Sequence, residues 1–198
     1  ATRYGPVFFL ALYTGMRRSE LLGLRWTAVD LDAKTVSVVE TLQRILGKGM
    51  MTLQPKTANS RRLINLPASA AALLNGLKVK QKEQRQFSGL EWQESDYVFC
   101  LADGRPYSPD KVSLAFAEVI KKAGLPHIRL HDLRHTHATM MMAQGVNPKT
   151  VAERLGHSSV VITLDTYSHV LPGLQEEAAL KFEEGLRKTT RQQAVEES

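Results

Sequence analysis

Apolar positions near the start of the chain recur with a helical period. Pro6, at a first-turn position, precedes an almost unbroken apolar stretch that predicts a short buried helix ending near Gly15. Ser19 is suited to cap a second helix in ELLGLRW, which places Arg17 in the connecting turn. Residues 68–86 are alanine-rich and then basic, and they predict a longer helix. The pattern therefore predicts an arginine-bearing turn held between apolar helices.

Between these helices, β-branched and polar residues alternate, as they do in half-buried strands. We expect three short antiparallel strands at residues 35–42, 50–56 and 62–66, with LGKG as the turn between the first two. Lys56 then lies at a strand end, directly before the turn TANS. Another strand-like piece, YVFC, stands within a loop at residues 87–107. The chain is predicted to be an α+β protein, mostly helical with a small three-stranded antiparallel sheet.

Histidines and an arginine gather on one predicted helix in the last third of the chain. His131, Arg134 and His135 stand at i, i+3 and i+4, so all three project from one helical face. That face is cationic and rich in hydrogen-bond donors. The inward-facing stripe of the same helix is predicted at Leu133, His137 and Met140.

A second, shorter helix is expected directly afterwards. Asn147-Pro148 supplies its cap and first-turn proline, and Gly156 closes it. His157 follows that closure, and Tyr167 comes ten residues later. The intervening run VVIT would suit a strand by propensity, but we expect a further helix, capped by one of the two preceding serines. Short connections then bring His157 and Tyr167 together.

Helices are also expected on either side of this region. Ser108-Pro109 opens one that Gly124 stops, and its apolar side is core scaffolding. After Tyr167, apolar residues four apart predict an amphipathic helix with an acidic outer face, at Leu174, Ala178, Phe182 and Leu186. We expect one domain at residues 1–170, with residues 171–198 as its C-terminal helix and tail.

The positive charge is concentrated in the body of the chain. The net charge is +6 overall, but residues 171–198 carry −2 and residues 1–170 carry +8. A polyanionic partner fits this balance, and a merely soluble basic surface is the alternative. The single cysteine, Cys100, excludes an intrachain disulfide and fits a reducing compartment.

Neither end of the chain predicts a membrane anchor. The apolar stretch VFFLALYTGM, at residues 7–16, is too short to span a bilayer and is followed by charged residues where a cleavage site would need small ones. We therefore expect a buried helix there and a cytoplasmic protein. Because residue 1 is Ala rather than Met, we expect these residues to be part of a longer chain.

These residue types together suit phosphate chemistry. The planar fork of arginine matches phosphate oxygens, and arginines with histidines place several donors around a phosphodiester without a metal. Tyr167 beside them is a candidate nucleophile. Because the pKa of a free tyrosine is near 10, forming its phenolate at pH 7 costs about 4 kcal/mol. A neighbouring base or cation cluster must therefore assist it.

In the order of their motifs, these residues resemble the catalytic domain of a tyrosine recombinase, of the phage integrase family of site-specific DNA recombinases. The resemblance covers nearly the whole chain. The matching motifs are TGMRRSELLGLRW with Arg17, PKTANSRRLINLP with Lys56, HDLRH with His131 and Arg134, LGHSS with His157, and TLDTYSHV with Tyr167.

The resemblance implies the fold of DNA breaking-rejoining enzymes and a catalytic role for each of these residues. Tyr167 would attack a DNA phosphodiester, giving a 3′-phosphotyrosyl link and a free 5′-hydroxyl. Lys56 would protonate the leaving oxygen, and His131 would bind the phosphate or act as base. The non-bridging oxygens would be held by Arg17, Arg134 and His157. No cofactor and no metal is implied, since the broken bond's energy is kept in the covalent intermediate.

The resemblance also implies partners. These are double-stranded DNA and further copies of the chain, assembled as a tetramer on DNA. The segment 171–198 would dock on a neighbouring protomer, or alternatively pack on its own domain. Such a protein would be encoded by a bacterium or phage, associate with the nucleoid, and integrate or excise a phage or other mobile element. The family's core-binding and arm-binding domains are expected ahead of residue 1.

Three other interpretations stay open at this point. His131, His135 and His157 would form a zinc site, but Asp132 replaces the glutamate of the His-Glu-x-x-His motif and Arg134 would bring a cation toward the metal. A type IB topoisomerase shares the covalent chemistry, and a DNA-binding module that lost catalysis shares the basic surface. Within the recombinase interpretation, Lys48 competes with Lys56 as the hairpin lysine, without the Lys-Thr context.

Overall fold

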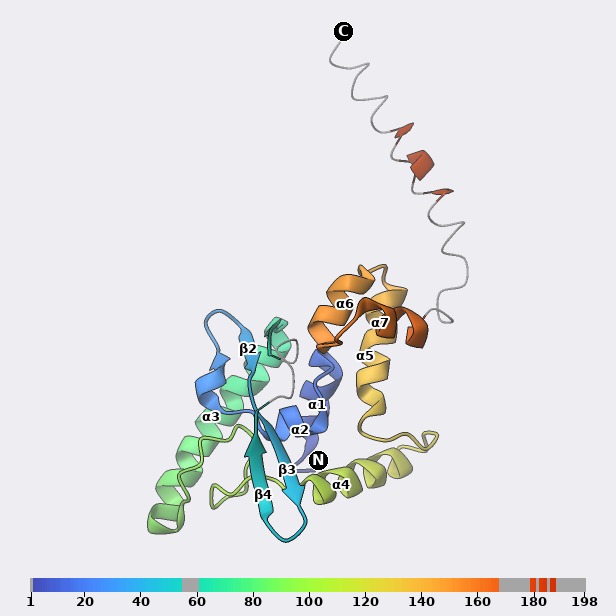
Figure 1. The fold of residues 1–198 in the computed structure, drawn as a ribbon. Helices are drawn as coiled ribbons and strands as arrows, with labels where there is room; N and C mark the ends of the chain where they lie inside the picture. The colour runs from blue at the N-terminus through green and yellow to red at the C-terminus, as the bar shows by residue number, and fades with distance from the viewer. Residues whose placement is uncertain (1, 55–60, 168–178, 181, 185, 188–198) are drawn as a thin grey trace.

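Two helices at the start of the chain lie at the centre of the molecule (Figure 1). The computed structural model describes residues 2–54, 61–167, 179–180, 182–184 and 186–187. Helix α1 (Gly5–Thr14) has a proline in its first turn and ends at Gly15, whose φ of 64° is left-handed. Helix α2 (Arg18–Leu22) follows, with Arg17 as its N-cap residue. The predicted buried helix and the turn that carries Arg17 are confirmed. The prediction that Ser19 caps the second helix is wrong, because Ser19 lies within α2.

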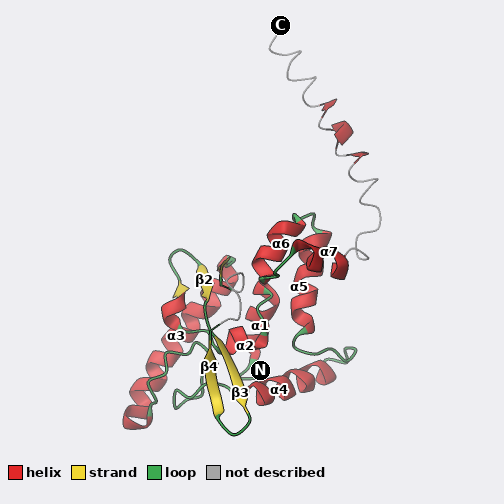
Figure 2. Cartoon of the chain, viewed as in Figure 1, coloured by secondary structure: helices red, strands yellow, loops and turns green. Residues whose placement is uncertain are grey.

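The strands divide into a sheet and a separate hairpin among the described residues (Figure 2). The sheet has the order β1-β2-β5, with neighbouring strands antiparallel. Strands β3 and β4 pair with each other, also antiparallel. The strands are β1 (Val29–Asp30), β2 (Thr35–Val38), β3 (Thr41–Ile45), β4 (Gly49–Leu53) and β5 (Arg62–Asn65).

The predicted three-stranded antiparallel sheet is present, but one member differs, since β1 lies in the sheet and the predicted strand at residues 50–56 pairs outside it. The predicted strand at residues 35–42 is broken at residues 39–40, where the chain leaves β5 as a partner and begins to pair with β4. Glu40 at this break is ion-paired with Arg25 at 2.8 Å. The polar-apolar alternation continues through the break because it records only which side of the chain is buried, not which strand lies alongside.

The remaining helices begin and end close to their predicted positions. They are α3 (Ala68–Ser88), α4 (Pro109–Lys122), α5 (Asp132–Ala143), α6 (Pro148–Leu155) and α7 (Val160–Tyr167), with short 3-10 turns η1 (Trp26–Ala28) and η3 (Gly89–Glu91). The run VVIT is helical, as expected, and the Ser159 hydroxyl accepts a hydrogen bond from the Val161 amide at 3.1 Å. The protein is thus mostly helical with a small antiparallel sheet.

The core lies between α1, α2, β2, β5, α3 and α4, and a smaller cluster lies between α5 and α6. Fully buried members of the main core include Val7, Leu10, Leu21, Val36, Ile64, Leu74 and Val112. The smaller cluster contains Ala138, Met142, Val151 and Leu155. Met140, predicted to face inward, is 52% exposed, so this prediction is wrong. The inward face of α5 is formed by Arg134, His137, Ala138 and Met142, so His137 faces inward as predicted and Met140 does not.

Two of the predictions fall wholly or partly outside the described residues. Lys56, with the turn that follows it, is one of them. In the segment 171–198, residues 179–180, 182–184 and 186–187 are helical, and their apolar side chains Leu180, Phe182 and Leu186 are 61%, 70% and 54% exposed. Across the described part of the chain, no helix combines the length and apolarity needed to cross a bilayer.

Candidate active site

Arg17 stands in the α1–α2 turn, and Glu20 one turn later holds it. The Arg17 amide donates to Glu20 Oε2 and its guanidinium Nη1 donates to Glu20 Oε1, each at 2.8 Å. The Glu20 side chain is 2% exposed, whereas that of Arg17 is 37% exposed. Arg17 is therefore anchored at its base while part of its side chain reaches the surface. The two hydrogen bonds show that Glu20 orients the Arg17 guanidinium.

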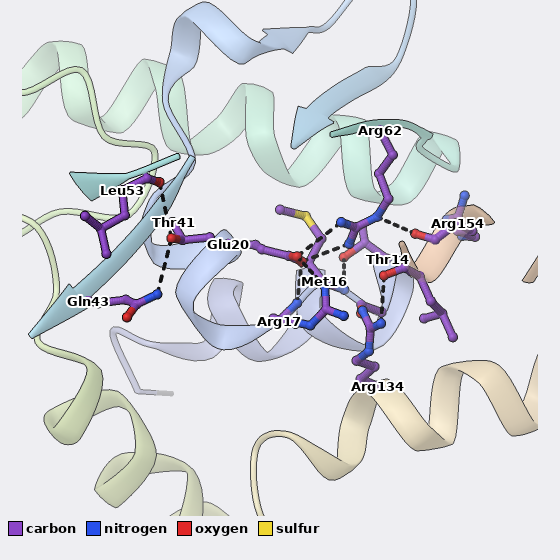
Figure 3. Close-up of polar contacts among 12 residues, drawn as sticks. Thr14, Met16, Arg17, Glu20, Thr41, Gln43, Leu53, Arg62, Arg134 and Arg154 are labelled. Carbon is purple, nitrogen blue, oxygen red and sulfur yellow. Dashed lines mark hydrogen bonds and ion pairs between the residues drawn. The ribbon is translucent and has the colours of Figure 1, made fainter. Parts of the chain in front are cut away.

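Arg134 lies on the buried side of α5 and bridges two other segments of the chain. Its Nη1 donates to the Gly15 carbonyl at 2.8 Å, and its Nη2 donates to the Leu155 carbonyl at 2.7 Å. Arg134 is 4% exposed. In Figure 3 its side chain extends from α5 toward the α1–α2 turn that carries Arg17. Arg134 thus joins α5 to the turn after α1 and to the end of α6.

His131 directly precedes α5, as its N-cap residue, and Asp132 is the first helical residue. Asp132 accepts hydrogen bonds from the Arg129 amide and guanidinium, which fix the chain that leads into the helix. The rings of His131 and His135 meet edge to face, with centroids 5.3 Å apart. Burial, and then the charges of His135, Arg134 and Arg17, lower the pKa of His131.

His157 follows the glycine that ends α6. Gly156 has a φ of 68°, which a glycine adopts without strain, and it turns the chain toward α7. The Nδ1 atom of His157 lies 2.8 Å from the hydroxyl of Thr163, a fully buried residue of α7. Burial, followed by the charges of Arg134, Arg17 and Arg62, lowers the pKa of His157 to about 4. His157 is therefore neutral at pH 7.

Arg62 in β5 is a site residue that sequence reasoning missed. Its guanidinium forms a two-pronged ion pair with Glu20, with Nη2 2.8 Å from Oε2 and Nη1 3.1 Å from Oε1. Its Nε donates to the Arg154 carbonyl at 2.7 Å. A signal was present in the sequence, because Arg62 stands two residues before Ile64 and therefore on the inward face of the strand. An arginine at such a position requires a buried acceptor.

His137 and Arg154 stabilise the end of α1, directly before the turn that carries Arg17. His137 Nδ1 lies 2.8 Å from the Leu12 carbonyl, and Arg154 Nε donates to His137 Nε2 at 3.1 Å. Since Nε2 accepts a hydrogen bond, the ring proton is on Nδ1 and donates to Leu12. Arg154 also donates to the Tyr13 carbonyl at 3.0 Å. His137 is thus structural, as the sequence predicted.

Four of the six predicted site residues converge in the fold. Arg17, Arg134, His131 and His157 come from three separate segments, and the charges of both arginines lower the pKa of both histidines. Of the other two, Lys56 lies outside the described residues. Tyr167 is the last residue of α7, two turns after His157, and nothing is described of its side chain. The arrangement is a cluster of positively charged and hydrogen-bond-donating side chains, suited to an anion.

In the described part of the chain, no three His, Cys, Asp or Glu side chains are grouped so that they could hold a metal ion. The prediction that the site uses no metal stays a prediction. The hydrogen-bond donors of the site are the guanidinium and imidazole nitrogens of its arginines and histidines.

The fold is that of tyrosine recombinases and integrases among solved structures. The Tn1549 transposon integrase in complex with transposon right end DNA superposes with a TM-score of 0.76 at 24% identity, covering 90% of this chain and 57% of that one. XerA recombinase superposes with a TM-score of 0.64 at 21% identity, covering 91% and 62%. Residues 1–173 match the phage integrase family, and the chain belongs to that family. The resemblance stated from the motifs is confirmed.

Related sequences agree with this assignment. A tyrosine recombinase XerC-like protein of Caldanaerobacter subterraneus subsp. tengcongensis is 34% identical over 181 residues, covering 86% of this chain and 46% of the relative. The ICEBs1 integrase of Bacillus subtilis is 33% identical over 177 residues, covering 89% and 48%. The chain therefore spans about half the length of the curated relatives it matches. Phage and transposon proteins are also among its relatives.

Proposed function

We propose that this chain is the catalytic part of a site-specific DNA recombinase that cuts and rejoins strands through a 3′-phosphotyrosyl intermediate. Its role would be the integration or excision of a phage or other mobile element. The observation that carries the proposal is that three segments bearing Arg17, His131 with Arg134, and His157 meet. Arg134 joins them by donating to the Gly15 carbonyl, before Arg17, and to the Leu155 carbonyl, before His157. Residues 1–170 would form the catalytic domain, with residues 171–198 as its C-terminal helix and tail.

In the proposed reaction, the Tyr167 hydroxyl oxygen attacks the phosphorus of a DNA phosphodiester. A phosphorus–oxygen bond to tyrosine forms while the bond from phosphorus to the 5′-oxygen breaks. The tyrosine proton passes to His131, and Lys56 donates a proton to the departing 5′-oxygen. The negative charge on the non-bridging oxygens is held by Arg17, Arg134 and His157. The 5′-hydroxyl of the second strand then attacks the phosphotyrosine phosphorus, which forms the new phosphodiester bond and releases Tyr167. The Tyr167 oxygen regains its proton from His131, and Lys56 takes up the proton of the 5′-hydroxyl, so no external energy source is needed.

The electrostatics of the two histidines support these assignments. Because the pKa of His131 is lowered, its imidazole is neutral at pH 7 and has a lone pair that accepts the tyrosine proton. Because the pKa of His157 is about 4, it is neutral as well. If the Thr163 hydroxyl donates to Nδ1, the ring proton of His157 is on Nε2 and donates to a phosphate oxygen. Losing one such preorganised donor costs about 3 to 4 kcal/mol of barrier.

Double-stranded DNA is the proposed substrate, and a homotetramer on DNA is the proposed assembly. The +8 charge of residues 1–170 favours a polyanion. The Tn1549 transposon integrase, which has the same fold, is in complex with transposon right end DNA in its solved structure. The exposed Phe182 and Leu186, one helical turn apart, favour docking of the C-terminal segment on a neighbouring protomer, since exposed apolar patches mark interaction sites. A cytoplasmic, nucleoid-associated protein fits this role.

The test is a nicked or suicide duplex, incubated with the natural full-length protein. We expect a covalent protein–DNA adduct that resists denaturation, is lost in Tyr167→Phe, and is unaffected by a chelator. An adduct of equal yield in Tyr167→Phe would remove Tyr167 from its role. Inhibition by the chelator would instead favour the zinc-site interpretation of His131, His135 and His157. Strand exchange between two duplexes separates recombination from supercoil relaxation by a topoisomerase.

A further inference from the structure

Four hydrogen bonds converge on the buried Glu20 carboxylate (Figure 3). Oε2 accepts from the Arg17 amide at 2.8 Å and from Arg62 Nη2 at 2.8 Å. Oε1 accepts from Arg17 Nη1 at 2.8 Å and from Arg62 Nη1 at 3.1 Å. An ionised carboxylate offers about four acceptor positions, so those of Glu20 are all occupied. Its orientation is therefore defined by both arginines together.

Arg62 is the more firmly fixed of the two. Its side chain is 6% exposed, against 37% for Arg17. The Nε atom donates to the Arg154 carbonyl, and the backbone of β5 is paired with β2 at Val38. A methyl group added at Gly156 would come within 2.9 Å of Arg62 Nη1, so the chain packs closely against the guanidinium. The position of the Arg62 guanidinium is therefore fixed, and it in turn fixes the position of the Glu20 carboxylate.

The charges explain why a second arginine is needed here. One carboxylate facing one guanidinium would cancel most of the charge that Arg17 offers to an anion, whereas two guanidiniums sharing Glu20 leave a net charge of +1. Burial raises the pKa of Glu20, but the hydrogen bonds and charges of Arg62 and Arg17 outweigh it and lower the pKa overall. Glu20 is therefore ionised at neutral pH, and the shared pair keeps its positive surplus.

We propose that Arg62 is a positioning residue of the active site, which fixes the direction in which Arg17 presents its guanidinium to the scissile phosphate by gripping both oxygens of Glu20. Arg62 itself is buried and does not touch the phosphate. The Nε of the same guanidinium donates to the Arg154 carbonyl near the end of α6, which holds the Arg62 side chain in place. This inference rests on the proposed function, because it takes the ligand of Arg17 to be a DNA phosphate.

The test compares Arg62→Lys with the unaltered full-length protein in adduct formation at saturating suicide duplex. A lysine keeps the charge, but its single ammonium cannot grip both carboxylate oxygens. We expect DNA affinity to change little and the rate of adduct formation to fall by about 10- to 100-fold, as expected for a small misplacement of a phosphate-binding group. In an Arg17→Ala background, the same substitution should cost no more than about 2-fold, because its effect passes through Arg17.

Arg25→Lys is the matched control. Arg25 forms a comparable ion pair with Glu40 at 2.8 Å, half-buried, but takes no part in the site. Arg25→Lys should lower the thermal stability about as much as Arg62→Lys does, but should leave the rate of adduct formation unchanged. If Arg62→Lys does not fold, Glu20→Asp replaces it, since a carboxylate one methylene shorter cannot keep all four bonds. The same two comparisons then apply.

The outcomes are distinct. An unchanged adduct rate in a folded Arg62→Lys or Glu20→Asp protein overturns the inference, and so does an equal loss with and without Arg17. Absence of any Tyr167-dependent adduct in the unaltered protein overturns the proposed function itself, and the inference with it. A loss that disappears in the Arg17→Ala background supports the positioning role.

Discussion

Arg134 and Arg17 carry the same guanidinium group, but the fold holds them in different ways. Arg134 is 4% exposed, and its two terminal nitrogens donate to the backbone carbonyls of Gly15 and Leu155. Arg17 is anchored by a carboxylate, and its side chain is 37% exposed. Carbonyls are neutral, so Arg134 keeps its full charge, whereas Arg17 shares Glu20 with Arg62.

This difference assigns two tasks to two arginines. Arg134 connects three segments of the chain, which we call the framework of the site, and it also contributes positive charge to the site. Arg17 contributes charge and direction, but the framework remains connected through Glu20 and Arg62 without it. Substitutions at the two positions should therefore affect stability differently even where they affect the proposed reaction alike.

The largest effect is expected for Arg134→Ala. The buried carbonyls of Gly15 and Leu155 lose their donor, and each buried unsatisfied polar group costs about 1 to 3 kcal/mol. We expect the free energy of unfolding to fall by about 2 to 4 kcal/mol in urea denaturation, and adduct formation to fall by about 1,000-fold or more. An Arg134→Ala protein as stable as the unaltered one would contradict the framework role.

Arg17→Ala should impair the reaction without unfolding the protein. Removing one preorganised donor to the phosphate is expected to slow adduct formation by about 100- to 1,000-fold. The free energy of unfolding should fall by only about 1 kcal/mol, because one hydrogen bond is lost while Glu20 keeps the Arg17 amide and both Arg62 nitrogens as donors. If urea denaturation instead shows a loss as large as that of Arg134→Ala, the contrast between the two arginines is wrong.

Mild acid should weaken the Arg134 side of the site first. The pKa of His137 is lowered to about 4, by burial and then by the charge of Arg154, and that of His157 is also about 4. Since an unfolded histidine takes up its proton near pH 6.5, the unfolded state binds protons first as the pH falls. The free energy of unfolding should thus be constant above about pH 6.5 and fall toward pH 4, by at most about 3 kcal/mol for His137.

The Arg17 side behaves differently in this range. The pKa of Glu20 lies below its ordinary value of 4.5, so the stability it contributes is lost only as the pH falls below that value. His137→Gln should therefore flatten the slope of stability against pH between about 6.5 and 4.5, whereas His127→Gln, at an exposed position, serves as the matched control. An unchanged slope in His137→Gln would refute the assignment.

The smallest effect compares two glycines of similar backbone geometry. Gly15 and Gly124 have φ values of 64° and 66°, so alanine is strained at both. A methyl group at Gly15 would lie 2.6 Å from Leu155 Cδ2 and 2.7 Å from His137 Cδ2, whereas nothing lies within 4 Å at Gly124. Thermal denaturation should show Gly15→Ala less stable than Gly124→Ala by about 1 to 2 kcal/mol. An equal loss of stability in the two variants would mean that the turn at Gly15, which accepts a hydrogen bond from Arg134, is loosely packed.

The helices and the order of the motifs could be predicted from the sequence because both are local. Asn147-Pro148 and Gly156 delimit α6 as expected, since capping depends on neighbouring residues alone. The turn that carries Arg17 follows from the apolar helices beside it. Membership of the phage integrase family likewise followed from five motifs in their order, and the family match confirms it.

Only the tertiary structure decided which distant groups meet. The sequence placed Arg134 on the cationic face of α5, but it did not show that this side chain would be buried on two carbonyls, one of them 119 residues away. It did not reveal that Arg62 would share Glu20 across 42 residues, or that the strand at residues 35–42 would change partners midway. Residue periodicity determines which side of a helix or strand faces inward. Backbone carbonyls and sheet edges, however, are chemically alike along the chain. Which carbonyl an arginine binds, and which strand pairs with which, is therefore decided only when the whole core packs.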